Sequence, residues 1–150
     1  MVFGGTGGGT TNLQASISVA NRLSISAGRT LDAESKTITL SGSDSTATTF
    51  PLEVTGTFTA DTSTVTYSGT GATTVASTTF NNLTVSGATT YTLGGNTTVS
   101  TTATISAGAT LNDGGFELTL SGSGTPLSKA NGVSVFTGTE IYSAAAATNI

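Results

Sequence analysis

Residues 103–122 read ATISAGATLNDGGFELTLSG, and 80 residues earlier residues 23–42 read LSISAGRTLDAESKTITLSG. Between residues 25–42 and 105–122, ten of the eighteen aligned positions are identical. The chain therefore contains an internal repeat. Such repeats are typical of proteins in which one structural unit buries its apolar face by stacking on the next.

A shorter period runs through each copy. Apolar residues stand six, six and seven positions apart, at Val19, Ile25, Leu31 and Ile38 in the first copy and at Val99, Ile105, Leu111 and Leu118 in the second. A helix would place them three and four apart, and one long strand would alternate throughout. The spacing instead predicts short strands joined by corners. Small residues with glycine fall where these corners are expected, at Ala27-Gly28, Ser41-Gly42, Ser86-Gly87, Gly94-Gly95, Ala107-Gly108 and Gly114-Gly115.

Three such sides make a coil of about 19–20 residues, the size of one β-solenoid turn. We therefore predict an all-β fold, a parallel β-helix (β-solenoid) of about seven coils, right-handed on general precedent. Residues 1–150 form a single repeat domain, with internal copies at about 2–65 and 66–143 and a tail at 144–150. The alternative is a β-sandwich of the pilin or immunoglobulin type, but a Greek key has no reason to carry the internal duplication.

The composition suits exposed, uncharged strands. Threonine and serine supply 54 of the 150 residues, only 8% are charged, and cysteine, histidine and tryptophan are absent. With a net charge of −4 and four scattered cations, no basic patch is expected, so we predict no nucleic-acid partner. No apolar run is long enough to span a membrane, and the first residues lack the pattern of a signal peptide.

Four segments carry a resemblance to a known group. They are FNNLTVSG (80–87), YTLGGN (91–96), TISAGATL (104–111) and ELTLSGSGTPL (117–127). Together they resemble the Thr/Ser/Gly-rich β-solenoid repeats of large bacterial surface and adhesin-like proteins. The resemblance implies a parallel β-helix and an extracellular or cell-surface location, and it carries over no functional residue.

No pattern points to catalysis, a cofactor or a metal. The glycine-rich residues 4–9 lack the lysine of a phosphate-binding loop and the spacing of a dinucleotide fingerprint. Asp32 and Glu34 could pair for acid–base work or bind a cation, but the second copy has Asn112 and Gly114 there, which favours solvated surface charge. With no histidine and four scattered cations, we predict that the protein is not an enzyme.

Two patterns that a binding module would show are present only in part. The pairs Thr37-Ile38-Thr39 and Thr57-Phe58-Thr59 lie twenty residues apart, as an ice-binding array would require, but the series fails at residues 97–99 and 117–119. The aromatic residues are spread unevenly, which favours core packing over a sugar-stacking platform. A cell-surface carbohydrate- or ice-binding module, with surface glycans as partners, is thus the alternative function.

The main functional prediction is structural. Neither terminus shows a cap of helix, proline or charge, and uncapped solenoid ends template pairing with another chain. Residues 2–10 resemble residues 66–74, so we expect residues 2–10 of one copy to follow residues 141–143 of another as residues 65–74 stand within the chain. We predict a subunit or segment of an extracellular filament, stalk or adhesin that assembles head to tail with copies of itself by β-strand stacking. The predicted interface comprises Val2, Phe3, Gly4, Ile141, Tyr142 and Ser143.

Overall fold

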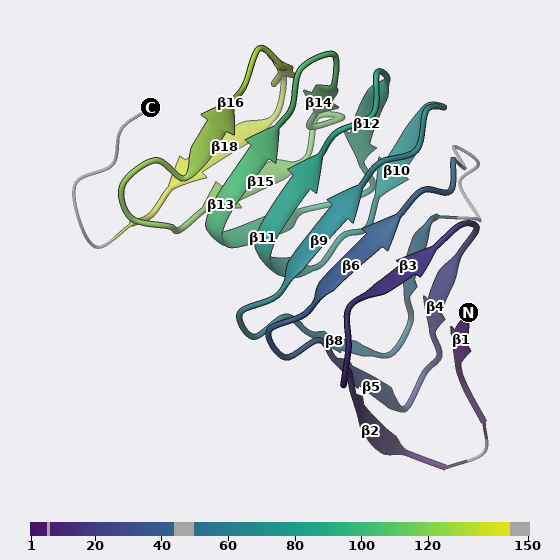
Figure 1. The fold of residues 1–150 in the computed structure, drawn as a ribbon. Helices are drawn as coiled ribbons and strands as arrows, with labels where there is room; N and C mark the ends of the chain where they lie inside the picture. The colour runs from purple at the N-terminus through teal and green to yellow at the C-terminus, as the bar shows by residue number, and fades with distance from the viewer. Residues whose placement is uncertain (6, 44–49, 145–150) are drawn as a thin grey trace.

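The computed structural model describes residues 1–5, 7–43 and 50–144. Within these ranges the fold is all-β, with eighteen strands and no helix, and every strand pairs with its neighbours in parallel (Figure 1). The predicted β-solenoid is confirmed. The β-sandwich alternative is wrong, because a Greek key is built from antiparallel strands. The solenoid has about six turns rather than the seven expected.

The chain winds around three faces. One of them, the long face, carries an uninterrupted hydrogen-bonded ladder. In order along the solenoid it contains β3 (Ile17–Val19), β6 (Thr37–Leu40), β9 (Thr64–Tyr67), residues 82–85 of β11 (Thr79–Val85), residues 102–105 of β13 (Thr97–Ile105) and β16 (Leu127–Lys129). This ladder joins the whole molecule from one end to the other.

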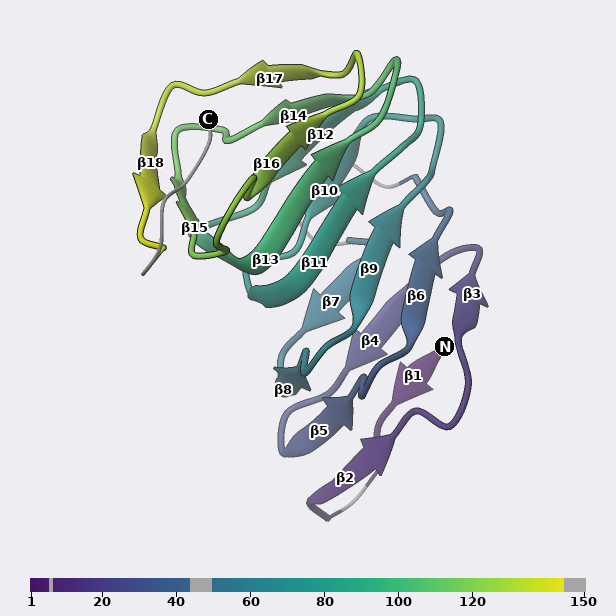
Figure 2. The ribbon, with the colours of Figure 1, turned by 60° about the vertical axis from the view of Figure 1, so that its left-hand side comes forward.

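The other two faces are each divided into two sheets (Figure 2). The second face contains β1 (Val2–Phe3), β4 (Leu23–Ile25) and β7 (Leu52–Val54), then β10 (Thr73–Val75), β12 (Thr90–Leu93), β14 (Thr110–Asn112) and β17 (Val133–Val135). The third face contains β2 (Gly9–Asn12), β5 (Arg29–Asp32) and β8 (Thr57–Thr59), then residues 79–80 of β11, residues 97–99 of β13, β15 (Glu117–Leu120) and β18 (Thr139–Tyr142). In the described ranges no ladder joins β7 to β10 or β8 to β11.

Coil length varies more than the sequence period suggested. Val65 pairs with Leu83, 18 residues later, whereas Ile38 pairs with Val65, 27 residues later. The longer coil contains residues 43–50, whose counterpart in the second copy is five residues shorter, so the sequence predicts a loop outside the stack there. Of these, residues 44–49 fall outside the described residues, as does the predicted tail except Ala144. Longer coils explain why the chain completes about six turns.

The two copies of the sequence repeat do not lie on the same face. Along the chain the faces follow one another in the order long, second, third, and each element of the second copy lies one face earlier than its counterpart in the first. Ile25 lies on the second face and Ile105 on the long face. Leu31 and Leu111 lie on the third and second faces, and Ile38 and Leu118 lie on the long and third faces. The 80-residue step covers eleven sides, one short of four full coils. The repeated unit is therefore one strand with its corner.

A slim apolar core fills the centre. Inward apolar side chains alternate with outward polar ones on most strands. The predicted core packing of aromatics is confirmed for Phe58, Phe80 and Tyr91, which are buried, and is wrong for Phe116, which is 40% exposed. Phe58 and Phe80 pack with ring centroids 6.2 Å apart across the break in the third face. Tyr67 and Tyr91 pack edge to face at 6.4 Å. The core thus continues where the ladders stop.

Two buried tyrosine hydroxyls bind backbone groups at the corners before β10, after β10 and before β12. The Tyr91 hydroxyl donates to the carbonyl oxygen of Gly69 (2.6 Å) and accepts from the N–H of Gly87 (2.8 Å). The Tyr67 hydroxyl accepts from the N–H of Ala76 (3.0 Å). Burial raises the pKa of both tyrosines, so both stay protonated and available as donors.

Glycine serves two different purposes at the predicted corners. At Gly28 and Gly108 the backbone adopts φ values of 75° and 83°, which disfavour residues with a Cβ. At Gly42 and Gly87 the need is space, because a Cβ would overlap backbone atoms of the preceding coil. The strand-to-strand distance therefore selects glycine where the long face turns into the second face.

Candidate functional site

The two ends of the solenoid expose unpaired strand edges. At one end β1, β2 and β3 each pair on one side only, and at the other end β16, β17 and β18 do the same within the described residues. Such edges present a row of free N–H and C=O groups. The ends lie at opposite limits of the molecule (Figure 2).

The predicted interface residues divide between these ends. Val2 is 66% exposed, while the neighbouring Phe3 packs against the core. Val2 and Phe3 form β1 on the second face, and Ile141 and Tyr142 belong to β18 on the third face. Gly4 and Ser143 directly follow these two strands. Both groups therefore lie at ends, but on different faces.

The last coil reverses the usual alternation of apolar and polar side chains. Ser134 and Glu140 stand in register with the buried Leu111 and Leu118, so polar groups occupy these inward positions. The apolar side chains of Val133, Val135 and Ile141 face outward instead and are 53%, 40% and 36% exposed. The prediction that neither terminus carries a charged cap is wrong at this end, because the charged side chain of Glu140 lies over the core. The sequence signal for this reversal was the alternation of apolar and polar residues in the last two strands, which is shifted by one residue relative to the strands they pair with.

Asp113 anchors this last coil to the one before it. Its buried carboxylate accepts hydrogen bonds from the N–H groups of Gly115, Thr137 and Gly138 and from the hydroxyl of Thr137. Burial acts to raise the pKa of Asp113, but these four hydrogen bonds together lower the pKa to about 2. Burial and the nearby Asp113 carboxylate raise the pKa of Glu140.

The outward side of the long face carries columns of hydroxyl groups. The central column passes, in pairing order, through Ser18, Thr39, Thr66, Thr84, Thr104 and Ser128. A second column, two residues earlier on each strand, contains Thr37, Thr64, Asn82 and Thr102. This differs from the sequence expectation, in which Thr37-Ile38-Thr39 was aligned with Thr57-Phe58-Thr59. Because coil length varies, Thr57 and Thr59 lie in β8 on the third face.

Three carboxylates meet where the third face turns into the long face. Oxygen atoms of Asp32, Glu34 and Asp61 lie within 4.8 Å of one another, and the Asn12 amide donates to Glu34 (2.7 Å). The Asp32 carboxylate is the main reason why the pKa of Asp61 is raised. Three carboxylates provide oxygen ligands of the type that calcium prefers, though calcium takes six to eight of them. The sequence paired Asp32 with Glu34 but did not indicate Asp61, because the intervening coil is unusually long.

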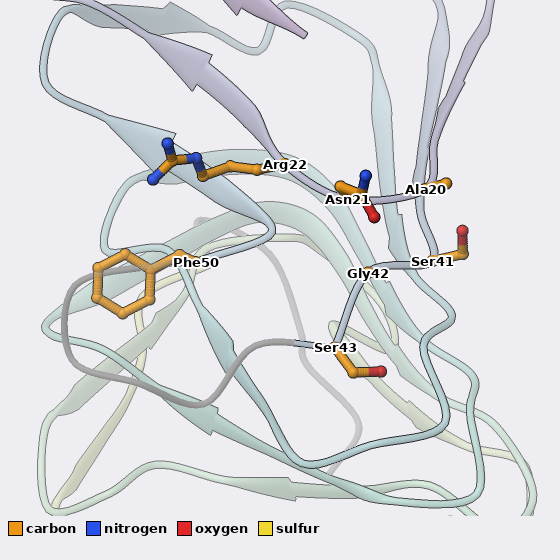
Figure 3. Close-up of a pocket in the computed structure, with 7 residues that line it drawn as sticks. All are labelled: Ala20, Asn21, Arg22, Ser41, Gly42, Ser43 and Phe50. Carbon is orange, nitrogen blue, oxygen red and sulfur yellow. The ribbon is translucent and has the colours of Figure 1, made fainter.

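A pocket of about 320 Å³ lies at the corner between the long and second faces (Figure 3). Its lining is Ala20, Asn21, Arg22, Ser41, Gly42, Ser43 and Phe50. The Arg22 and Phe50 side chains extend to one side, while the hydroxyls of Ser41 and Ser43 point elsewhere. Arg22 already forms a partly exposed ion pair with Glu53 (3.4 Å). These groups do not converge on a point where a substrate atom could react.

No known family matches this chain. No family model, curated protein or solved structure gave a match to the sequence or to the fold. The described ranges also contain no helix that could cross a membrane.

Proposed function

We propose that this chain is a structural segment of an extracellular filament, stalk or adhesin, which lengthens by stacking further β-coils on its ends. The observation that carries the proposal is the set of unpaired strand edges at both ends of the described solenoid. The parallel ladder of the long face supports a mechanical role, because continuous backbone hydrogen bonds resist bending. The resemblance of the repeats to those of bacterial surface proteins supports the location.

The winding order defines how two copies would stack head to tail. The second face ends in β17 at one end and in β1 at the other, and the third face ends in β18 and β2. Stacking that continues the solenoid therefore pairs β17 with β1 and β18 with β2 of the next copy. The predicted partners Val2 and Ile141 then belong to adjacent strands of the joint rather than to one pair.

One backbone position tests this pairing without disturbing the fold. The N–H of Val133 donates to the carbonyl oxygen of Ala109, and the carbonyl oxygen of Val135 accepts from the N–H of Asp113. Both residues therefore direct their backbone groups toward the preceding coil. Because these directions alternate along a strand, the N–H of Ser134 points to the open edge. A proline there removes an outward donor and is tolerated at an edge.

The experiment compares the parent chain, S134P and S134A by sedimentation velocity over a range of protein concentrations. The parent and S134A, which keeps the N–H group, should form a concentration-dependent series of larger species. S134P should remain a monomer with the same circular dichroism spectrum. A parent chain that stays monodisperse and monomeric at the highest concentration would refute the proposed function.

Substitution of Glu140 provides a second test, in which assembly should become stronger and not weaker. Its inward position over the core means that a stacked coil would bury its carboxylate, which is costly when the group is charged. We expect E140Q to assemble at lower concentration than the parent at pH 7, and the parent to assemble more readily as the pH falls. Equal assembly of E140Q and the parent at every pH would show that the joint does not cover this position.

A further inference from the structure

The long face presents a regular grid of small polar groups. Four consecutive strands align in register with the same outward pattern, a hydroxyl or amide at every second position. Their rows are Thr37, Thr39 and Ser41; Thr64, Thr66 and Ser68; Asn82, Thr84 and Ser86; and Thr102, Thr104 and Ser106. Eleven of these twelve groups are hydroxyls. None is charged.

The central threonines are available to solvent and rigidly placed. Thr39, Thr66, Thr84 and Thr104 are partly exposed, and within the described residues their hydroxyls make no hydrogen bond to the protein. Each is flanked on its strand by buried apolar residues that fix the backbone. Threonine is also stiff at χ1 because it is β-branched. The positions of methyl and hydroxyl groups are therefore set before any ligand arrives.

Composition alone does not produce this grid, because the other faces lack it. Outward positions on the second face include the charged Glu53 and the apolar Val133 and Val135, and those on the third face include the charged Asp32 and Glu117. Both faces are also interrupted between their two sheets. Of the described faces, only the long face combines a ladder unbroken from end to end with a hydroxyl or amide group at every second position of four consecutive strands.

The geometry points to an ordered lattice of water as the ligand, and we propose that the long face binds ice. Rows repeat about every 4.8 Å along the solenoid, and columns repeat about every 6.7 Å along each strand. Both repeats are close to oxygen spacings in hexagonal ice, so bound waters can occupy lattice positions while hydrogen bonded to threonine hydroxyls. An uncharged surface with no long flexible side chains holds this water without disrupting its order.

This function goes beyond the proposed structural role and is independent of it. Ice would contact the side of the solenoid, whereas stacking uses its ends. End-to-end assembly would add further rows to the grid. Loss of assembly in S134P should therefore leave ice binding by each monomer intact.

The test uses two matched substitutions of outward threonines by tyrosine. T66Y places a bulky side chain in the centre of the grid, and T92Y places the same side chain on the outward side of β12 on the second face. Tyrosine is well accepted in strands, so both variants should fold. Circular dichroism and melting temperature serve as the check on folding.

The measurements are partition into a growing ice hemisphere and inhibition of ice recrystallisation. The parent and T92Y should enter the ice and keep crystals small, and T66Y should lose most of both activities. T66V, which keeps the methyl group of threonine and replaces its hydroxyl with a second methyl, should lose part of both activities. Failure of the parent to enter ice, or equal losses in T66Y and T92Y, would overturn the proposal. Binding to crystalline cellulose or chitin without binding to ice would also overturn it.

Discussion

Removal of one buried hydroxyl should weaken the two coils that follow the break in the second and third faces. In Y91F the N–H of Gly87 and the carbonyl of Gly69 lose their hydrogen-bond partner, and Tyr91 is fully buried. A buried polar group left without a partner costs about 1–3 kcal/mol, so the two groups together should cost about 3 kcal/mol. For a chain of this size the melting temperature should fall by about 6–12 °C.

The same substitution at the other two buried or half-buried tyrosines provides a graded control. Y67F removes one hydrogen bond, to the N–H of Ala76, and should have about half the effect. Tyr142 is half-buried and its hydroxyl makes no hydrogen bond to the described residues, so Y142F should change the free energy of unfolding little. Urea and thermal unfolding followed by circular dichroism measure all three variants. Equal effects of Y91F and Y142F would refute the hydrogen-bonding role.

Three further predictions concern the carboxylates and one corner. D61N should raise the melting temperature at pH 7 more than at pH 3. The Asp32 carboxylate raises the pKa of Asp61, so charged Asp61 destabilises the folded state once the pH exceeds the pKa of the unfolded chain. Asparagine removes this destabilisation. Asp113, whose pKa falls from 3.8 unfolded to about 2 folded, contributes stability above pH 3.8 that is lost as pH falls toward 2. D113N should therefore be less stable at pH 7 and less sensitive to acid, and hydrogen exchange should locate the loss in residues 133–143. G87A should destabilise strongly, since its Cβ would overlap the carbonyl of Gly69, whereas G115A meets no neighbouring atom and tests only the left-handed φ of 83°; melting temperatures compare the two.

The solenoid could be predicted from the sequence because each strand carries its own signal. Apolar residues six or seven positions apart, with glycine between them, specify a strand and a corner wherever they occur, so Ile25 and Ile105 both become inward residues of short strands. The corners at Gly42 and Gly87 follow from the same pattern. Strands and corners depend only on residues close together in the sequence, so they can be predicted without knowing how the coils stack.

Placement of strands on faces could not be predicted, because it depends on summed coil lengths. Each inserted or deleted residue between strands changes which residues stack, so a constant period of twenty aligned Thr39 with Thr59 although the ladder pairs Thr39 with Thr66. The hydroxyl grid of the long face was missed for this reason. The approach of Asp61 to Asp32 was missed for the same reason.

The central claim is that parallel coils stack along one axis and continue through the ends of the molecule. Electron microscopy of concentrated parent protein, with an averaged power spectrum of the particles, tests it most directly. Stacked coils should give unbranched filaments with a strong meridional reflection near 4.8 Å, the spacing between stacked strands. Filaments without that reflection, or discrete particles at every concentration, would contradict it.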